Sequence, residues 1–178
     1  AQMEEAEAAG ERGESASRMR AEVGAVHLAE RLRGSLGSPL VLGCRGAGRL
    51  TGRLAEVGAD WLLLEDEQSR PCLVATAAVQ SVGGLGRLTS APEAAGAVRA
   101  RLDLRRALRG LARDRSPVQI FLDDGGVLSG TLDRVGADYV ELAEHPGDLP
   151  RRAEAVQSVR AVVIGAVAVV RTAVPRLD

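Results

Sequence analysis

Two stretches of this chain carry the same pattern, so its fold has to be one that the sequence can form twice. Residues 50–61 read LTGRLAEVGADW and residues 128–139 read LSGTLDRVGADY, which is an offset of 78. The dipeptide Ser-Pro recurs at the same offset, at residues 38–39 and 116–117. Several matched blocks in one order indicate a duplicated supersecondary unit.

Two further matches extend the repeat in both directions. Leu-Arg-Gly recurs at residues 32–34 and 108–110, an offset of 76, and Ala-Val-Gln-Ser-Val recurs at residues 78–82 and 155–159, an offset of 77. One deletion in the intervening loop would account for the change from 78 to 77. We therefore predict copy one at residues 25–88 and copy two at residues 98–178. We also predict an acidic tail or helix at residues 1–24 and a Gly/Ala/Pro linker at residues 89–97.

Each copy is expected to begin with an amphipathic helix. Apolar residues recur at helical spacing in both copies. They are Ala25, Ala29, Leu32 and Leu36 in copy one, and Leu104, Ala107, Leu108 and Leu111 in copy two. The Ser-Pro dipeptide then stops the helix, because the residue before proline avoids the helical conformation.

Five short strands are expected after each helix. The first three lie near residues 40–44, 50–54 and 61–64, and their repeats near residues 118–122, 128–132 and 139–142. Glycine-rich turns at residues 46–48 and 123–126 favour tight hairpins. Gly52 and Gly130, inside the second strands, indicate a sharp bend of the kind that small barrels use at corners.

This arrangement resembles the Sm-like small barrel. The first half of the Sm signature is similar to Gly52-x-Leu54-x-x-Val57 and to Gly130-x-Leu132-x-x-Val135. The composition, rich in Ala, Gly and Arg, also resembles uncharacterised actinobacterial proteins, some of which carry a Fis-type transcription-factor label; we find no helix-turn-helix pattern here. The resemblance implies two tandem Sm-like five-stranded barrels, rings of protomers and binding of single-stranded RNA.

Two departures from the Sm pattern bear on the nucleic-acid site. Sm proteins contact a base with an Asn near the start of strand three, where this Asn-free chain has Leu62 or Val140. The Arg-Gly pair after strand four is replaced by residues 82–84 and 159–161. The fold can therefore be kept while the RNA site is lost, since a fold does not determine a function.

A basic cluster marks copy two alone. Residues 98–115 carry seven Arg and two Asp, a local charge of +5, although the whole chain has a net charge of −1. Arginines of the expected helix lie away from its leucine stripe and could bind phosphates or an acidic partner. They are Arg101, Arg105, Arg106, Arg109 and Arg113. The alternative is a solvated face in a chain without lysine.

The acidic N-terminal segment offers a candidate partner for these arginines. Residues 1–22 contain six Glu and three Arg. They could form a helix that docks onto the arginine face or onto another protein. A frayed tail is the alternative, because Gly10 and Gly13 each weaken a helix by about 1 kcal/mol relative to Ala.

Two repeated pairs of residues are weaker candidates. Trp61 and Tyr139 match in position and could stack on a base, although packing is the commoner use of such residues. Asp60 and Asp138 also match, and a turn aspartate that accepts backbone N–H bonds is the favoured interpretation.

No constellation supports catalysis, a metal or a cofactor. The chain has two His and two Cys without zinc-ligand spacing. The Gly-x-Gly at residues 46–48 leads into a strand and is not a dinucleotide fingerprint. We predict no enzyme, no cofactor and no small-molecule substrate. Two cysteines, Cys44 and Cys72, favour free thiols and a cytoplasmic location.

The longest apolar run, residues 161–170, is informative about partners. It is about half the ~20 residues that a membrane-spanning helix needs, so we predict no membrane association. Both faces of a strand formed by it would be apolar, so it should be buried on both sides. We expect it to end copy two and to pack on copy one or pair with another protomer.

These observations favour a non-enzymatic protein-interaction or assembly module, with a protein partner or a second copy as the ligand. The alternative is an RNA- or DNA-binding regulator that uses the Arg-rich helix of copy two.

Overall fold

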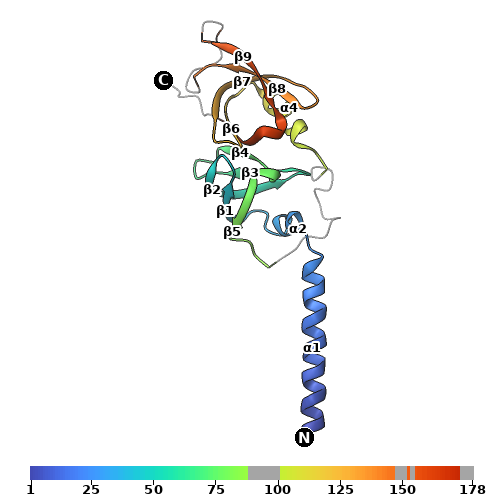
Figure 1. The fold of residues 1–178 in the computed structure, drawn as a ribbon. Coiled ribbons are helices and arrows are strands. Elements are labelled where there is room, and N and C mark those ends of the chain that lie inside the picture. The colour runs from blue at the N-terminus through green and yellow to red at the C-terminus, as the bar shows by residue number, and fades with distance from the viewer. Residues whose placement is uncertain (88–100, 147–151, 153–154, 173–178) are drawn as a thin grey trace.

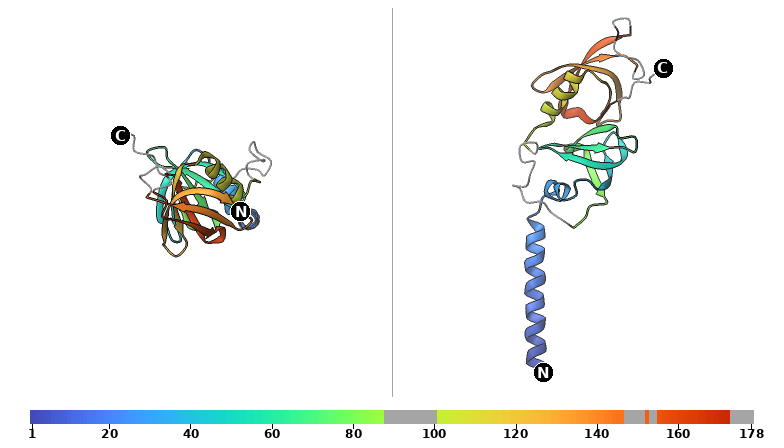
Figure 2. Two further views of the ribbon diagram at one scale, coloured as in Figure 1. Left: turned by 90° about the horizontal axis from the view of Figure 1, so that it is seen from above. Right: turned by 180° about the vertical axis from the view of Figure 1, so that it is seen from behind.

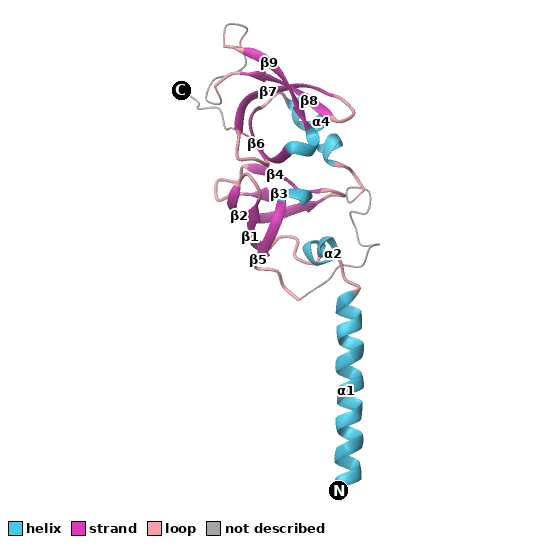
Figure 3. Ribbon diagram, viewed as in Figure 1, coloured by secondary structure: helices cyan, strands magenta, loops and turns pink. Residues whose placement is uncertain are grey.

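Strands dominate the architecture. The computed structural model describes residues 1–87, 101–146, 152 and 155–172, and in these ranges it is mainly β with a few helices (Figure 3). The linker predicted at residues 89–97 lies outside the described residues.

The N-terminal segment forms helix α1, Gln2–Gly24, which buries none of its residues. It extends away from the rest of the molecule in Figure 1 and in the right-hand view of Figure 2. The docking of this segment onto the Arg-rich helix, which its charge made possible, is therefore absent from the structure.

Among the described residues, ten strands form one open antiparallel sheet in the order β5-β1-β2-β3-β4-β10-β6-β7-β8-β9. The strands of copy one are β1 Pro39–Cys44, β2 Gly48–Val57, β3 Trp61–Glu65, β4 Pro71–Ala75 and β5 Val79–Gly83. Those of copy two are β6 Pro117–Leu122, β7 Val127–Val135, β8 Tyr139–Glu144, β9 Ser158–Val163 and β10 Val167–Thr172. Each copy thus contributes the same five-strand order, and the two sets join where β4 pairs with β10.

The hairpins form where glycines were expected to permit them. Strand β1 pairs with β2 up to Cys44 and Gly48, and both Gly46 and Gly48 have positive φ. Gly52 lies where the backbone of β3 passes close by, because a Cβ added to it would be 2.6 Å from the Glu65 carbonyl oxygen. A Cβ at Gly130 would overlap the Ala143 carbonyl of β8. The two strand glycines therefore permit close backbone approach.

The two helices next to the sheet differ in length. Helix α4, Leu104–Asp114, follows the prediction: Leu104 and Leu108 are buried, and Asp103 caps it by accepting a hydrogen bond from the Arg106 N–H (2.9 Å). The helix that was predicted for copy one is longer than the helix in the structure. Helix α2 spans only Leu28–Arg33, so Ala25 precedes it and the exposed Leu36 follows it.

The predicted alignment of the C-terminal part of each copy was wrong. The short 3-10 helix η1, Thr76–Ala78, corresponds to η2, Ile164–Ala166, an offset of 88 rather than 77. The Thr76 N–H donates to the Asp60 carbonyl (2.9 Å), as the Ile164 N–H donates to that of Asp138 (2.8 Å). Copy two therefore carries ten additional residues between Asp138 and Ile164 compared with the stretch between Asp60 and Thr76. The Ala-Val-Gln-Ser-Val match does not align equivalent strands.

The apolar run at residues 161–170 is two strands rather than one. Helix η2 separates β9 from β10. The expectation of burial holds for Val167–Val170, which are buried where β10 pairs with copy one, and fails for Val163.

Candidate functional site

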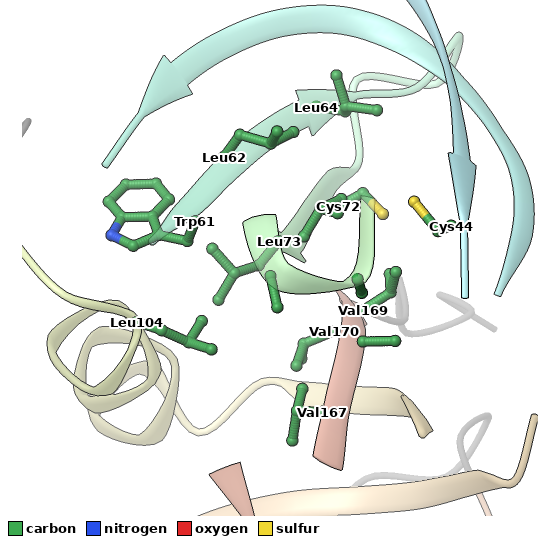
Figure 4. Packing of buried hydrophobic residues seen from close by; sticks show 14 of the residues in the cluster. Cys44, Trp61, Leu62, Leu64, Cys72, Leu73, Leu104, Val167, Val169 and Val170 are labelled. Atoms are coloured by element: carbon green, nitrogen blue, oxygen red, sulfur yellow. The ribbon is translucent and has the colours of Figure 1, made fainter. Parts of the chain in front are cut away.

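The seam between the two copies is built by strands β4 and β10. Val169 lies opposite Val74, and Val170 opposite Leu73. Helix α4 adds Leu104 from copy two, and Trp61 closes the copy-one side (Figure 4). The apolar contacts continue across the seam, so the two copies share one hydrophobic core. Units of this size gain stability from such sharing because each alone buries little surface.

Three hydrogen bonds fasten the turn after β2 to the segment that enters α4. The Leu102 carbonyl accepts from the Ala59 N–H (3.1 Å) and from the Trp61 indole Nε1–H (2.7 Å). The Leu104 N–H donates to a carboxylate oxygen of Asp60 (2.7 Å). Asp60 accepts a backbone N–H, as expected, but the donor lies 44 residues away in the other copy.

The corresponding parts of copy two are open. By strand register, Ala161 and Val163 of β9 occupy the positions of Leu73 and Ala75 in β4. Leu73 and Ala75 are 5% and 7% exposed, whereas Val163 is 60% exposed and Ala161 is also exposed. Strand β9 ends the sheet and has no strand on its outer side among the described residues. Copy two therefore presents to solvent the surface that copy one covers with β10 and α4.

Strand β9 is nevertheless well held on its inner side. It pairs with β8 from Ser158 to Val163. Arg160 donates to the Glu144 carboxylate (2.8 Å), and Ser158 donates to the same group. The hydrogen bond from Arg160, followed by that from Ser158, lowers the pKa of Glu144. The outer edge of β9 therefore belongs to a strand that is held in place by its pairing with β8.

The matched aromatic residues lie in different environments. The Trp61 ring packs over Gly58 and the Tyr139 ring over Gly136, because a Cβ added to either glycine would overlap the ring. Trp61 is 5% exposed at the seam, whereas Tyr139 is 40% exposed at the open end of copy two. The repeat in sequence gave no sign of this difference, which arises from what each copy has beside it.

The arginines predicted as an anion-binding site lie on and just before helix α4. Arg101, Arg106, Arg109 and Arg113 are exposed, and Arg105 is half-buried. Within the described residues none of these five side chains makes an ion pair that would neutralise it. Four of them lie on α4 and Arg101 just before it, and α4 is remote from α1 (Figure 1).

The cysteines and one histidine belong to the interior. Cys44 and Cys72 are buried free thiols. Burial, together with the neighbouring Cys72, raises the pKa of Cys44 to about 11, and burial also raises that of Cys72. Both are therefore protonated and poor nucleophiles at neutral pH. His145 is buried with its ring nitrogens 2.7 Å from the Thr131 hydroxyl and 2.9 Å from the Pro146 carbonyl.

Two hollows adjoin the seam. One, of about 150 Å³, is mostly apolar and lies between Trp61, Leu73 and Leu111. The other is open and brings Asp60, Asp103 and Asp138 near Arg105. In the described part of the chain no group of His, Cys, Asp or Glu side chains is arranged to hold a metal ion.

No helix in the described ranges is both long and apolar enough to cross a membrane. No protein-family model matches this sequence, and no curated protein is similar enough to it to indicate a relative. The candidate site therefore stands on geometry: a seam closed inside the chain, and an equivalent surface left open at the end of copy two.

Proposed function

We propose that this protein is a non-enzymatic assembly module in which edge strand β9 of one chain pairs with edge strand β5 of another. The observation that carries the proposal is the contrast between the buried Leu73 and Ala75 of β4 and the exposed Ala161 and Val163 of β9. An exposed apolar strand edge is a template for pairing with another chain.

The internal seam supplies the register of this contact. Applying the offset of 88 to the β4–β10 pairs puts Val162 opposite Ser81 of the next chain, and Ala161 opposite Val82. The contact uses different surfaces on its two sides. It therefore joins chains head to tail and forms a ring if the rotation closes.

We infer also that each copy is an Sm-like five-stranded barrel. Three observations support this: the same strand order in both copies, a helix before the first strand, and a glycine in the second strand at a close backbone approach. Small barrels that leave their edge strands open are suited to assembly, because only closure or pairing removes a sheet edge.

The intermolecular contact is weaker than the internal seam. Strand β5 has Gln80 and Ser81 where β10 has the buried Ala168 and Val169. The intermolecular contact therefore buries less apolar surface. Burial of apolar surface contributes roughly 25 cal/mol of association free energy per Å², so this contact gains less. We expect assembly that depends on protein concentration.

Sedimentation velocity from low to high micromolar concentration tests this proposal. The mass should rise above the 18.6 kDa of one chain. Val163→Lys should weaken association by about tenfold or more, because a charge would be buried in the contact. Val127→Lys is the matched control, since Val127 is also exposed but lies on an inner strand. A single-chain mass at every concentration, or equal association of both variants, would refute edge pairing.

A second candidate function, binding of single-stranded RNA, is favoured by the unneutralised arginines of α4. Replacing Arg106 and Arg109 with Ala should lower affinity for a mixed RNA pool and make the log–log salt slope shallower by about 0.7 for each phosphate that is no longer bound. Fluorescence anisotropy between low and moderate salt measures both quantities. Arg49→Ala together with Arg53→Ala on β2 is the control for the reduced positive charge. An identical salt slope for the wild type and the α4 variant would exclude this role.

A further inference from the structure

The turn of copy one between β2 and β3, Gly58–Trp61, holds the segment Leu102–Leu104 of copy two. Its Ala59 N–H and Trp61 indole donate to the Leu102 carbonyl, and its Asp60 carboxylate accepts from the Leu104 N–H. The turn therefore binds the segment at two points, through the carbonyl of Leu102 and through the N–H of Leu104. Such two-way hydrogen bonding fixes the direction of the bound segment.

Copy two repeats this turn, and no described segment of the chain is hydrogen-bonded to it in the way that Leu102–Leu104 is bonded to the first turn. In Gly136–Tyr139 the Gly136 N–H donates to the Tyr139 carbonyl (2.8 Å), as Gly58 does to Trp61 (2.8 Å). The Tyr139 ring lies over Gly136 in the same way. Among the described residues nothing hydrogen-bonds the Asp138 carboxylate, and both Asp138 and Tyr139 are exposed. Within the part of the chain that the structure describes, the second turn is thus formed and vacant.

Copy one has a segment at the position that is equivalent to the segment held by the turn. An offset of 76 relates Leu102–Leu104 to Val26–Leu28. Each segment enters its helix through an extended residue, with φ −81° and ψ 166° at Asp103 and φ −83° and ψ 153° at His27. Leu104 is buried, but Val26 and Leu28 are exposed. Copy one therefore presents a matching segment with no turn to hold it.

We propose that the turn Gly136–Tyr139 of one chain binds the segment Val26–Leu28 of a second copy. Asp138 accepts from the Leu28 N–H, and the Ala137 N–H donates to the Val26 carbonyl. This inference rests on the proposed assembly and specifies its direction. It brings β9 of one chain beside β5 of the next and excludes β9–β9 pairing, in which two turns would meet without a segment.

The contact should hold less tightly than its internal counterpart. Tyr139 has no indole N–H, so the second hydrogen bond to the segment's carbonyl is missing. The remaining bond to a carboxylate is of the stronger, charge-assisted kind.

The test is a pair of substitutions at the repeated aspartate. Asp138→Ala should raise the dissociation constant about 10- to 100-fold, the range expected for a hydrogen bond to a charged group, and leave the urea midpoint of the dissociated chain unchanged. Asp60→Ala should instead lower the urea midpoint of the chain, because it removes the hydrogen bond between Asp60 and the Leu104 N–H at the seam. Sedimentation equilibrium and urea unfolding measure the two quantities.

A second pair tests the segment. Leu28→Pro removes the backbone N–H at the first helical position, where proline is well tolerated, and the extended His27 suits a following proline. Leu28→Ala removes the side chain and keeps the N–H. The proline variant should associate about tenfold less tightly than the alanine variant, at equal helicity by circular dichroism.

The outcomes separate this inference from the proposed function. If the wild type associates and Val163→Lys does not, while Asp138→Ala and Leu28→Pro associate normally, edge pairing stands and the turn contact is refuted. If the wild type remains a single chain throughout, both are refuted.

Discussion

Trp61→Ala should lower the free energy of unfolding by about 3–5 kcal/mol, the range for deleting a large buried aromatic side chain. The indole is 5% exposed and donates to the Leu102 carbonyl across the seam. Its removal leaves a cavity beside α4 and an unpaired acceptor in the segment that enters that helix. Urea unfolding followed by far-UV circular dichroism measures the loss.

The repeat supplies a control in the same chain. Tyr139→Ala removes the matching ring, which is 40% exposed, and should cost the isolated chain about 1 kcal/mol, as single substitutions commonly do. Equal losses for the two variants would mean that the seam does not form in solution. Because Tyr139 lies in the vacant turn, Tyr139→Ala should also weaken association between chains directly. Trp61→Ala should affect association only by destabilising the chain.

The strands and hairpins could be predicted because their signals are local. Alternation places Val118, Ile120 and Leu122 on one face, and β6 buries the first two. The glycines at residues 46–48 supply the positive φ that the hairpin uses. The Val-Gly-Ala-Asp motif likewise forms the same turn in both copies.

The C-terminal alignment failed for a physical reason. A short strand tolerates many sequences of the right alternation, so five identical residues do not establish structural equivalence. What aligns the copies is the hydrogen bond from Thr76 or Ile164 to the preceding turn, and that bond is between backbone groups. Backbone contacts of this kind leave no residue signature to read.

The role of Asp60 could not be predicted for a related reason. Its acceptor function was foreseeable from its place in a turn, but its donor is set by how the two copies pack.

The length of α2 was overestimated because Ala25, Ala29, Leu32 and Leu36 have helical spacing. The extended His27, whose N–H donates to the Glu30 carboxylate (2.7 Å), starts a new helix within that stretch.

Val169→Asp should have the second large effect, a loss of more than about 3 kcal/mol, because it buries a charge without a partner. Val169 is fully buried between Val74 of β4 and Phe121 of β6. Rather than retain this charge inside, the seam should open and expose the apolar faces of both copies. Urea unfolding and binding of an apolar dye report the two consequences.

Ser81→Asp is the corresponding change at the free edge, since Ser81 occupies in β5 the place of Val169 in β10. Ser81 is exposed, so the stability of the single chain should change by no more than about 0.5 kcal/mol. If chains pair through β9 and β5, the same substitution places a charge opposite Val162 and should weaken association. A stable Val169→Asp chain would contradict the seam itself. Normal association of the Ser81→Asp chain would not bear on the seam within the chain. It would contradict the proposal that β9 and β5 of two chains pair as β4 and β10 do within one chain.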